Sequence, residues 1–539
     1  MTESHLPGPE ATAGRREWTA LGVLLLPVLL VSMDLTVLFF AMPSITADLQ
    51  PSSTQQLWMV DIYGFVLAGV LITMGALGDR IGRRRLLLIG AVAFGAGSAL
   101  ASYAGTPELL IAARALQGIG GATLMPSTLA LIRNIFRDQA QRRTAVAVWS
   151  TGMAAGAALG PVISGLLLSQ FWWGSIFLVN IPVMVLLLVV GPILLPEFRA
   201  PAAGRFDLLG AVLSLVAVLP IVYGFKRIAV DGPGVLPVGG IAVGLVFGAL
   251  FVRRQRTSPD PLIDLEVLRA GVTRASVVTN MLASFVLVGF ALFSTQYMQS
   301  VLGMSALKSA LWTLPGTVAV GVSVPLATAL VRRVRPAYII CGGFLIAAVA
   351  LLAMTRLPDR DGLALLLIAI TAVAFGLAPV LALVTELVVG TADPARAGST
   401  SALLQTAQEF GGALGVAVLG SIGAAVYTHS ASLDAPADVP ADLLGPARET
   451  VGGALAVAGR LPQAAADTLA GAARAAFAEE VHAAALAGGA VMVLAGAFVL
   501  ATLRSVRNDA HQEQRTAGSA AGTTVDPAAA RTVLPAAES

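Results

Sequence analysis

The chain has 539 residues, of which 56% are hydrophobic and only 12% are charged, and its mean hydropathy is +0.82. Soluble globular proteins carry about 25% charged residues, so this composition excludes a soluble protein and indicates an integral membrane protein. The net charge is only +3, and the sequence has no basic face interleaved with aromatic residues, which argues against a nucleic-acid partner. A single cysteine, Cys341, excludes an internal disulfide.

About fourteen apolar runs, separated by short polar breaks, are each long enough to form a membrane-spanning helix. No segment alternates as a membrane β-strand does, so we expect an all-α protein. The first run is too long for a signal peptide and lacks a small-residue cleavage site. The predicted spans are 18–41, 56–77, 86–103, 108–131, 144–168, 176–195, 208–225, 236–251, 276–297, 306–331, 338–354, 363–389, 399–427 and 482–503.

Arginines concentrate in every second break between these runs. By the positive-inside rule those breaks face the cytoplasm, and an even number of spans places both termini there. The clearest clusters are Arg15 and Arg16, Arg83 to Arg85, Arg142 and Arg143, Arg253 and Arg254, Arg332 and Arg333, and Arg504 with Arg507.

The first run carries a lone carboxylate, Asp34, near its middle. An ionised acid is costly there, so it must be neutralised by a proton, by a cationic ligand, or by Arg114 of the fourth run. Proton and cation would then be alternative occupants of one acid, which is the basis of antiport. We expect this competition rather than a permanent pair between Asp34 and Arg114. For Arg114 the alternative is a side chain that extends to the lipid headgroups.

The second run contributes an acid and two aromatic residues. Asp61, Trp58 and Tyr63 lie close together in the sequence, and aromatic faces attract cations. We expect all three in a substrate site. The alternative for Asp61 is an acid at headgroup level.

The break after the second run reads GALGDRIGRRR. Its glycines at 75 and 78 would allow close approach to a neighbouring helix, and its acid would pair with an arginine or cap a helix in one conformation. We therefore expect a conformational latch formed by Asp79, Arg80, Gly75, Gly82 and Arg83.

The fourth and fifth runs carry two further motifs, RALQGIGGA from Arg114 and GMAAGAALGPVISG from Gly152. Small residues at four-residue intervals form one flat face in the second motif, and its proline removes a backbone hydrogen bond. We expect a closely packed helix that bends. The residues of this motif are Gly152, Gly156, Gly160, Pro161 and Gly165.

The second half of the chain carries its own intramembrane acid, Glu409 in the thirteenth run. We expect Glu409 to bind a proton or a cation, with Gln405 among the substrate contacts. The alternative is that Glu409 only pairs with a polar neighbour such as Gln405 or Gln408.

A short sequence pattern occurs twice and divides the chain into two halves. The pattern is found in ALGDRIGRRRLLLIG and in ALVRRVRPAYIICGG, and each stretch closes a helix at the cytoplasm. This repeat predicts two related six-helix halves.

A long external loop is expected to hold two amphipathic helices, 448–461 and 464–480, separated at Leu461-Pro462. The predicted divisions are an N-terminal segment 1–17, a six-helix bundle 18–200, two linker helices 201–255, a six-helix bundle 256–507 with the external loop 428–480, and a disordered tail 508–539.

The loop motif, the helix-4 motif and the helix-5 motif together resemble signatures of the fourteen-helix drug:proton antiporter branch of the major facilitator superfamily. The stretch from Asp48 to Gly69 is similar to QacA-type exporters of quaternary ammonium compounds and cationic dyes. In that family the acids matching Asp34 and Asp61 are implicated in proton coupling and cation recognition. Val320 and Gln405 stand where some relatives have acids, so recognition of divalent cations does not follow from the resemblance.

The resemblance implies a major facilitator fold of two six-helix bundles plus two central helices, with fourteen spans and both termini in the cytoplasm. It implies a monomer in the bacterial inner (plasma) membrane that exports lipophilic cationic drugs by alternating access. The energy source would be the proton gradient, with no cofactor and no metal. The expected partners are drugs or metabolites, protons and the lipid bilayer.

Other classes of protein fit the sequence less well. A membrane enzyme would need clustered reactive residues, yet the four histidines lie in the termini, the long loop or a helix edge, and no phosphate-binding GxxxxGK[ST] loop exists to bind ATP. A membrane sensor or scaffold would not require buried acids. Within transport, the alternative is a dedicated exporter of an endogenous metabolite or antibiotic.

Overall fold

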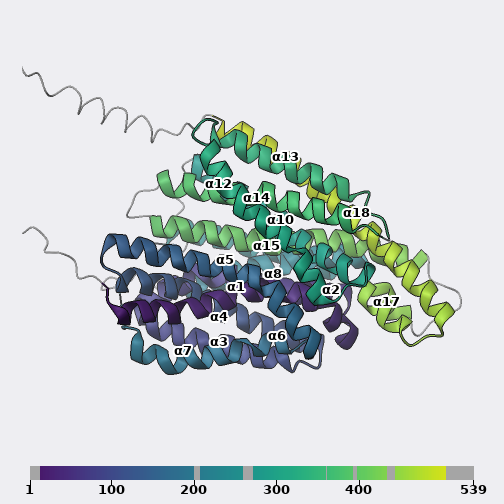
Figure 1. Ribbon diagram of the computed structural model, residues 1–539, viewed down its shortest axis with the longest axis horizontal. Coiled ribbons are helices and arrows are strands. Elements are labelled where there is room, and N and C mark those ends of the chain that lie inside the picture. The colour runs from purple at the N-terminus through teal and green to yellow at the C-terminus, as the bar shows by residue number, and fades with distance from the viewer. Residues whose placement is uncertain are drawn as a thin grey trace, which may run out of the picture.

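A computed structural model describes residues 13–199, 207–232, 234–258, 271–359, 361–391, 397–433 and 444–504. Long helices run side by side along the molecule, and the start of α1 and the end of α18 lie at the same end (Figure 1). The short helix α17 lies at the opposite end, which we call the α17 end. The predicted disordered tail, 508–539, lies outside the described residues.

The first half of the chain contains α1 (Arg15–Leu49), α2 (Ser53–Ile81), α3 (Arg83–Ser102), α4 (Pro107–Ile135), α5 (Gln139–Gln170), α6 (Ser175–Leu178) and α7 (Asn180–Leu194). Two further helices follow, α8 (Leu208–Asp231) and α9 (Val235–Thr257). The second half contains α10 (Gly271–Gln296), the π-helix η2 (Tyr297–Val301), α11 (Ala306–Trp312), α12 (Leu314–Leu330), α13 (Pro336–Met354), α14 (Leu363–Thr391), α15 (Ala397–Leu433), α16 (Leu444–Glu449), α17 (Val451–Ala458) and α18 (Gln463–Leu503).

Helix ends follow local capping chemistry. Ser52 begins α2 with a capping box, in which its hydroxyl accepts from the Gln55 amide and the Gln55 side chain accepts from the Ser52 amide. Thr106 caps α4, whose first residue is a proline. The chain leaves α2 at Gly82, where φ is +112°, a backbone conformation that residues with a Cβ rarely adopt.

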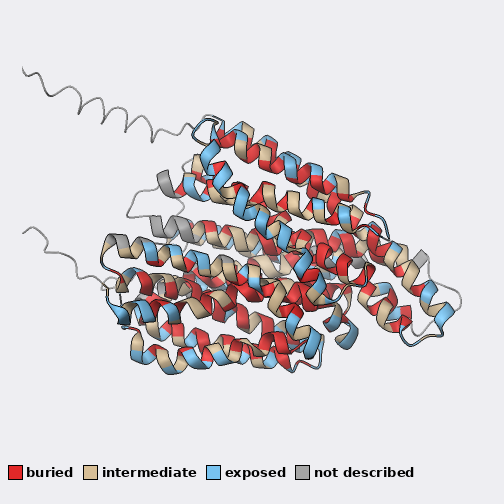
Figure 2. Cartoon of the chain, viewed as in Figure 1, coloured by how far each residue is buried: buried red, intermediate tan, exposed pale blue. Residues whose placement is uncertain are grey.

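Among the described residues, twelve helical segments are long and apolar enough to cross a membrane. Helix α8 adds a shorter apolar stretch, Val212–Gly224. Apolar side chains on outer helices are widely exposed, for example Val189 at 61% and Leu245 at 62%, and exposed residues alternate with buried ones along α7 and α13 (Figure 2). Such an apolar exterior suits lipid as the surrounding solvent.

The helices enclose two large hydrophobic cores. One consists mainly of side chains from α1 to α7, and the other mainly of side chains from α10 to α18. Helix α8 packs against both α2 and α15, where Phe65, Val222, Ala413 and Ala417 form a smaller cluster. The α8–α9 pair therefore lies beside the boundary between the two cores.

Several predicted segments differ from the observed helices. The predicted sixth and tenth spans are each interrupted, at Val179 and at Thr313. The second loop helix and the last span, predicted as separate, form one continuous helix, α18. The predicted break at Pro462 is confirmed, because this residue precedes α18. The long loop is shorter than expected, since α15 continues to Leu433.

Candidate functional site

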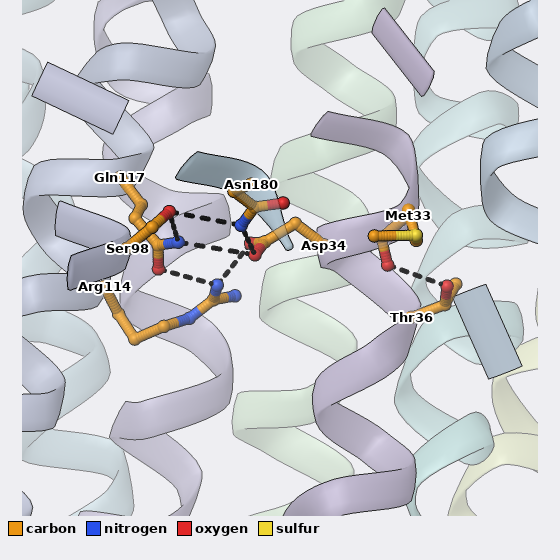
Figure 3. Close-up of polar contacts among 7 residues, drawn as sticks. All are labelled: Met33, Asp34, Thr36, Ser98, Arg114, Gln117 and Asn180. Atoms are coloured by element: carbon orange, nitrogen blue, oxygen red, sulfur yellow. Dashed lines mark hydrogen bonds and ion pairs between the residues drawn. The ribbon is translucent and has the colours of Figure 1, made fainter. Parts of the chain in front are cut away.

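A buried ion pair joins α1 to α4 inside the first core. Nη1 of Arg114 donates to Oδ2 of Asp34, and each residue is only 1% exposed. The same guanidinium nitrogen donates to Oε1 of Gln117 at 3.1 Å. Gln117 in turn donates to Oδ1 of Asp34 at 3.4 Å, so both carboxylate oxygens accept hydrogen bonds. Of the predicted alternatives, the pair with Arg114 is the one present in this conformation (Figure 3).

Two further polar residues complete this network from α3 and α7. The Ser98 hydroxyl accepts from Nε2 of Gln117 at 2.9 Å and from Nδ2 of Asn180 at 3.1 Å. Nδ2 of Asn180 also lies 3.5 Å from Oδ1 of Asp34. Residues of α1, α3, α4 and α7 thus form one hydrogen-bonded network around the Asp34 carboxylate (Figure 3). Such hydrogen bonds offset the cost of burying charge, which an isolated pair recovers only in part.

Arg114 is also enclosed by aromatic rings. Its guanidinium carbon lies 4.5 Å from the centroid of the Tyr63 ring and 5.8 Å from that of Phe177. Within the described chain, Nε of Arg114 and the Tyr63 hydroxyl have no hydrogen-bond partner. The alternative in which Arg114 extends to the headgroups is wrong for this conformation, because its side chain is buried.

The predicted substrate residues of α2 are placed in the interior or at its edge. Asp61 is buried, with 1% of its surface exposed. Trp58 packs against the small cluster between the two cores. Tyr63 is fully buried and lies within electrostatic range of Asp34, Arg114 and Glu409.

Glu409 lies on α15, which packs along α2. Nε2 of Gln405, one turn earlier, donates to Oε1 of Glu409 at 3.3 Å. In the part of the chain that the structure describes, no basic side chain forms an ion pair with this carboxylate. Asp34 and Glu409 therefore differ in the described structure: Asp34 is paired with a cation, whereas Glu409 accepts a hydrogen bond from a neutral amide.

The small-residue face of α5 packs on the helix that carries Asp34. A Cβ added at Gly156 would collide with the backbone carbonyl of Leu29, and one at Gly160 would collide with Thr36 and Met33 of α1. Ser164 donates to the carbonyl oxygen of Val37 at 3.1 Å. The predicted close packing of this face is confirmed.

The end of the α5 motif contacts the other half. An added Cβ at Gly165 would collide with the backbone of Leu307 in α11. Pro161 lies within α5, as the motif predicts.

The predicted latch loop is held by a partner that the sequence did not indicate. Arg84 and Arg85 each lie 3.8 Å from Oε2 of Glu197, and the Arg84 amide donates to Oε1 of Glu197 at 3.1 Å. The Arg83 amide donates to the Phe198 carbonyl at 2.9 Å.

The other predicted latch residues vary in their placement. Arg80 is exposed, and a Cβ added at Gly82 would collide with Glu197. The close approach expected at Gly75 is not observed, because an added Cβ there meets no atom within 4 Å. The side chain of Asp79 lies outside the described part of the structure.

Four polar residues of these sites were missing from the predicted set. Gln117 stands one helical turn after Arg114 within RALQGIGGA, and this spacing was a usable signal. Ser98, Asn180 and Glu197 lie in unremarkable sequence, and only the packing of distant helices brings them to their partners.

A bundle of lipid-facing helices that buries an ion pair and further acids in its interior is the architecture of a membrane transport protein. The Major Facilitator Superfamily model matches residues 24–416, and the chain belongs to this family of transporters. It is therefore a multi-pass protein of the bacterial plasma membrane and a transporter rather than an enzyme.

Several curated proteins are similar over nearly their whole length. The multidrug efflux pump LfrA of Mycolicibacterium smegmatis is 43% identical over 90% of this chain and 96% of its own. The methyl viologen resistance protein SmvA of Salmonella typhimurium is 36% identical, with coverage of 86% and 93%. The tetracenomycin C resistance and export protein of Streptomyces glaucescens is 32% identical, with coverage of 93% and 94%.

A solved structure shares the fold. The inward-facing, unoccupied bacterial homologue of the human lysosomal transporter Spinster has a TM-score of 0.61, with coverage of 91% of this chain and 99% of its own. The two sequences are only 18% identical, so this comparison shows a shared fold and nothing further.

Proposed function

We propose that the protein is a proton-coupled antiporter that exports lipophilic cationic drugs by alternating access. The observation that carries this proposal is the position of Tyr63. Its ring stacks on Arg114, the partner of Asp34, and lies within electrostatic range of Glu409 in the other half. One buried aromatic residue thus lies near a paired acid and an acid without a cation, where an organic cation would gain both charge neutralisation and cation–π contact.

The difference between the two acids assigns them different steps. Glu409 is the carboxylate open to a proton or a drug in this conformation, with Trp58, Tyr63, Asp61 and Gln405 as further substrate contacts. Competition at Asp34 requires Arg114 to move away first, so Asp34 takes part when the α1–α4 pair opens. Both acids and Arg114 are then coupling residues.

Proton release tests this assignment. Adding tetraphenylphosphonium to the detergent-solubilised protein in weak buffer should release protons from the wild type and none from Glu409→Gln. Adding Gln408→Glu to the Glu409→Gln variant places an acid one residue away on α15, and this double variant should still release no protons. An unchanged release in Glu409→Gln would reject Glu409 as the site of competition, and no release from the wild type would reject antiport.

The relatives support the substrate class. Methyl viologen, in the name of one of them, is a bis-quaternary aromatic cation, and another is described as a multidrug efflux pump. The tetracenomycin relative favours the second candidate, export of one endogenous metabolite or antibiotic. Uptake into inverted vesicles, scored against lipophilic cations and neutral antibiotics, separates the two: uptake of a single neutral compound would favour the dedicated exporter.

We further propose fourteen membrane crossings, which add α2 and α8 to the twelve apolar segments. The arginine pattern then places both termini in the cytoplasm and the α17 end outside. Contacts between the two halves support a closed outer end here, because Gln299 of η2 donates to the Phe40 carbonyl of α1 at 3.1 Å.

The latch is proposed to act at the cytoplasmic end. Asp79→Asn should lower turnover while dye binding at equilibrium stays nearly unchanged, because the residue would stabilise one conformation rather than contact substrate. Fluorescence titration beside vesicle transport measures both quantities. Loss of binding in a folded Asp79→Asn variant would contradict a latch.

A further inference from the structure

A small cavity of about 30 Å³ lies between the two halves at the α17 end. This volume holds about two water molecules and excludes a drug-sized cation. Six polar residues of α2, α10, α16, α18 and the start of α17 line it: Ser53, Gln56, Gln296, Glu449, Thr450 and Glu480.

The cavity has an excess of negative charge. Glu449 is fixed by Ser53, whose amide and hydroxyl donate to Oε2 of Glu449 at 3.1 and 2.9 Å. Glu480 lies opposite on α18, and the described structure gives it neither a hydrogen bond nor an ion pair. No lysine, arginine or histidine is among the lining residues. Two carboxylates therefore share a confined space without a cation.

A second observation also points to a ligand. Gln56 is 8% exposed, and in the described chain its Oε1 atom has no hydrogen-bond partner. An unsatisfied buried acceptor costs about 1–3 kcal/mol. Gln56 and both glutamates line the same cavity, and the partner that an amide oxygen lacks is a hydrogen-bond donor or a cation.

We propose that this cavity binds a small monovalent cation, either a hydrated proton or an alkali-metal ion, and that its occupant helps to hold the two halves together at the α17 end. The ligand would bridge Gln56 of the first half and Glu480 of the second. The proposal is independent of drug binding and of the central acids, since it rests only on residues around this cavity.

The other charged and titratable groups of the neighbouring helices have their own partners or are exposed. Tyr427 donates to the Ala447 carbonyl at 3.0 Å, and Arg474 donates to the Ser300 carbonyl at 3.3 Å. The His482 ring bonds the Leu357 carbonyl at 2.7 Å. Glu479 accepts from Ser430 at 2.7 Å, and Arg448 is exposed. Glu480 is thus the group whose charge the cation would neutralise.

Thermal unfolding of the detergent-solubilised full chain tests the site. NaCl and KCl are compared with N-methyl-D-glucamine chloride, whose cation is too large for the cavity, at equal ionic strength. A second arm varies pH from 8 to 6 in N-methyl-D-glucamine chloride. We expect the wild-type Tm to rise by about 2 °C or more in one of the arms, because a ligand that binds only the folded state stabilises it. The arm that responds identifies the occupant.

The matched variants are Glu480→Gln and its exposed neighbour Glu479→Gln. The response should disappear in Glu480→Gln and persist in Glu479→Gln. Gln56→Leu keeps the charge but removes the free acceptor, and should raise the cation concentration for half-maximal response about fivefold. This variant decides the matter if Glu480→Gln does not fold. Equal responses in wild type, Glu480→Gln and Gln56→Leu, or no wild-type response in either arm, would overturn the proposal.

Discussion

Asp34 shows how a membrane interior accepts an ionised acid. The carboxylate is bonded by Arg114, Gln117 and Asn180, and the arginine is stacked on Tyr63, so the charges are compensated within one network. A buried pair of this kind contributes little net stability, but loss of one partner leaves an uncompensated charge. Under the proposed function, this pair would open only when another cation or a proton takes the place of one partner.

Arg114→Ala should destabilise the protein by about 3–5 kcal/mol, because it leaves the Asp34 carboxylate buried without a cation. Chemical unfolding in detergent, followed by tryptophan fluorescence, measures the loss. The double variant Asp34→Asn with Arg114→Ala should recover part of the stability, since no buried charge is then stranded. Strictly additive losses would show that the two residues are not coupled.

Two substitutions at Tyr63 distinguish the contribution of its aromatic ring to stability from that of its hydroxyl group. Tyr63→Phe should change the free energy of unfolding by less than about 1 kcal/mol, because the hydroxyl has no partner in the described structure. Tyr63→Leu should cost about 2 kcal/mol or more, because the buried cation–π contact with Arg114 is lost. If Phe and Leu are equally damaging, the contact with Arg114 is not what stabilises this position.

At the scale of elements, the α1–α5 contact sets the position of the Asp34 helix. Glycines at 156 and 160 let the α5 backbone approach the Leu29 and Met33 carbonyls, and Thr36 donates to the Ala157 carbonyl at 3.3 Å. Helices in lipid associate through such close packing because no hydrophobic effect drives them together. Movement of α5 would therefore be transmitted to Asp34.

Gly156→Ala should lower stability by about 1–3 kcal/mol, because its Cβ would push α5 away from Leu29. Gly22→Ala on α1 is the matched control: an added Cβ there meets no atom within 4 Å, and alanine favours the helix. Thermal unfolding and drug export are measured for both variants. Similar behaviour of the two would mean that close packing at Gly156 is unimportant.

At the scale of the molecule, the two cores meet at the α17 end through several contacts. Ser53 of α2 donates to the Glu449 carbonyl at 2.7 Å, and a Cβ added at Gly452 of α17 would lie 3.0 Å from Cβ of Thr46 in α1. The helices after α15 thus cover this end of the first half. The proposed alternating access would require these contacts to break.

A cysteine pair at Thr46 and Gly452, in a chain with Cys341→Ala, should form a disulfide that stops export and is reversed by reduction. The Cβ atoms are near the separation that a disulfide needs. Gel mobility after oxidation, followed by vesicle transport, measures both effects, and each single cysteine is the control. Export at full rate by fully crosslinked protein would contradict opening at this end.

The sequence by itself determined the class of protein, because apolar run length, arginine placement and the glycine spacing of α5 are local properties. It also identified Asp34, Arg114 and Glu409, since a charge inside an apolar run stands out against its own neighbours.

Only the tertiary structure decided which groups neutralise these charges. Asp34 meets Arg114 across 80 positions and Asn180 across 146. The acceptor-lined cavity likewise joins Gln56 to Glu480, which belong to different halves of the chain. The partner of each charge depends on how the helices pack and rotate, and the hydropathy of the sequence records neither.

The sequence also did not predict that α18 is continuous. Its apolar pattern weakens at Glu479 and Glu480, whereas packing against α15 and α17 keeps the helix intact.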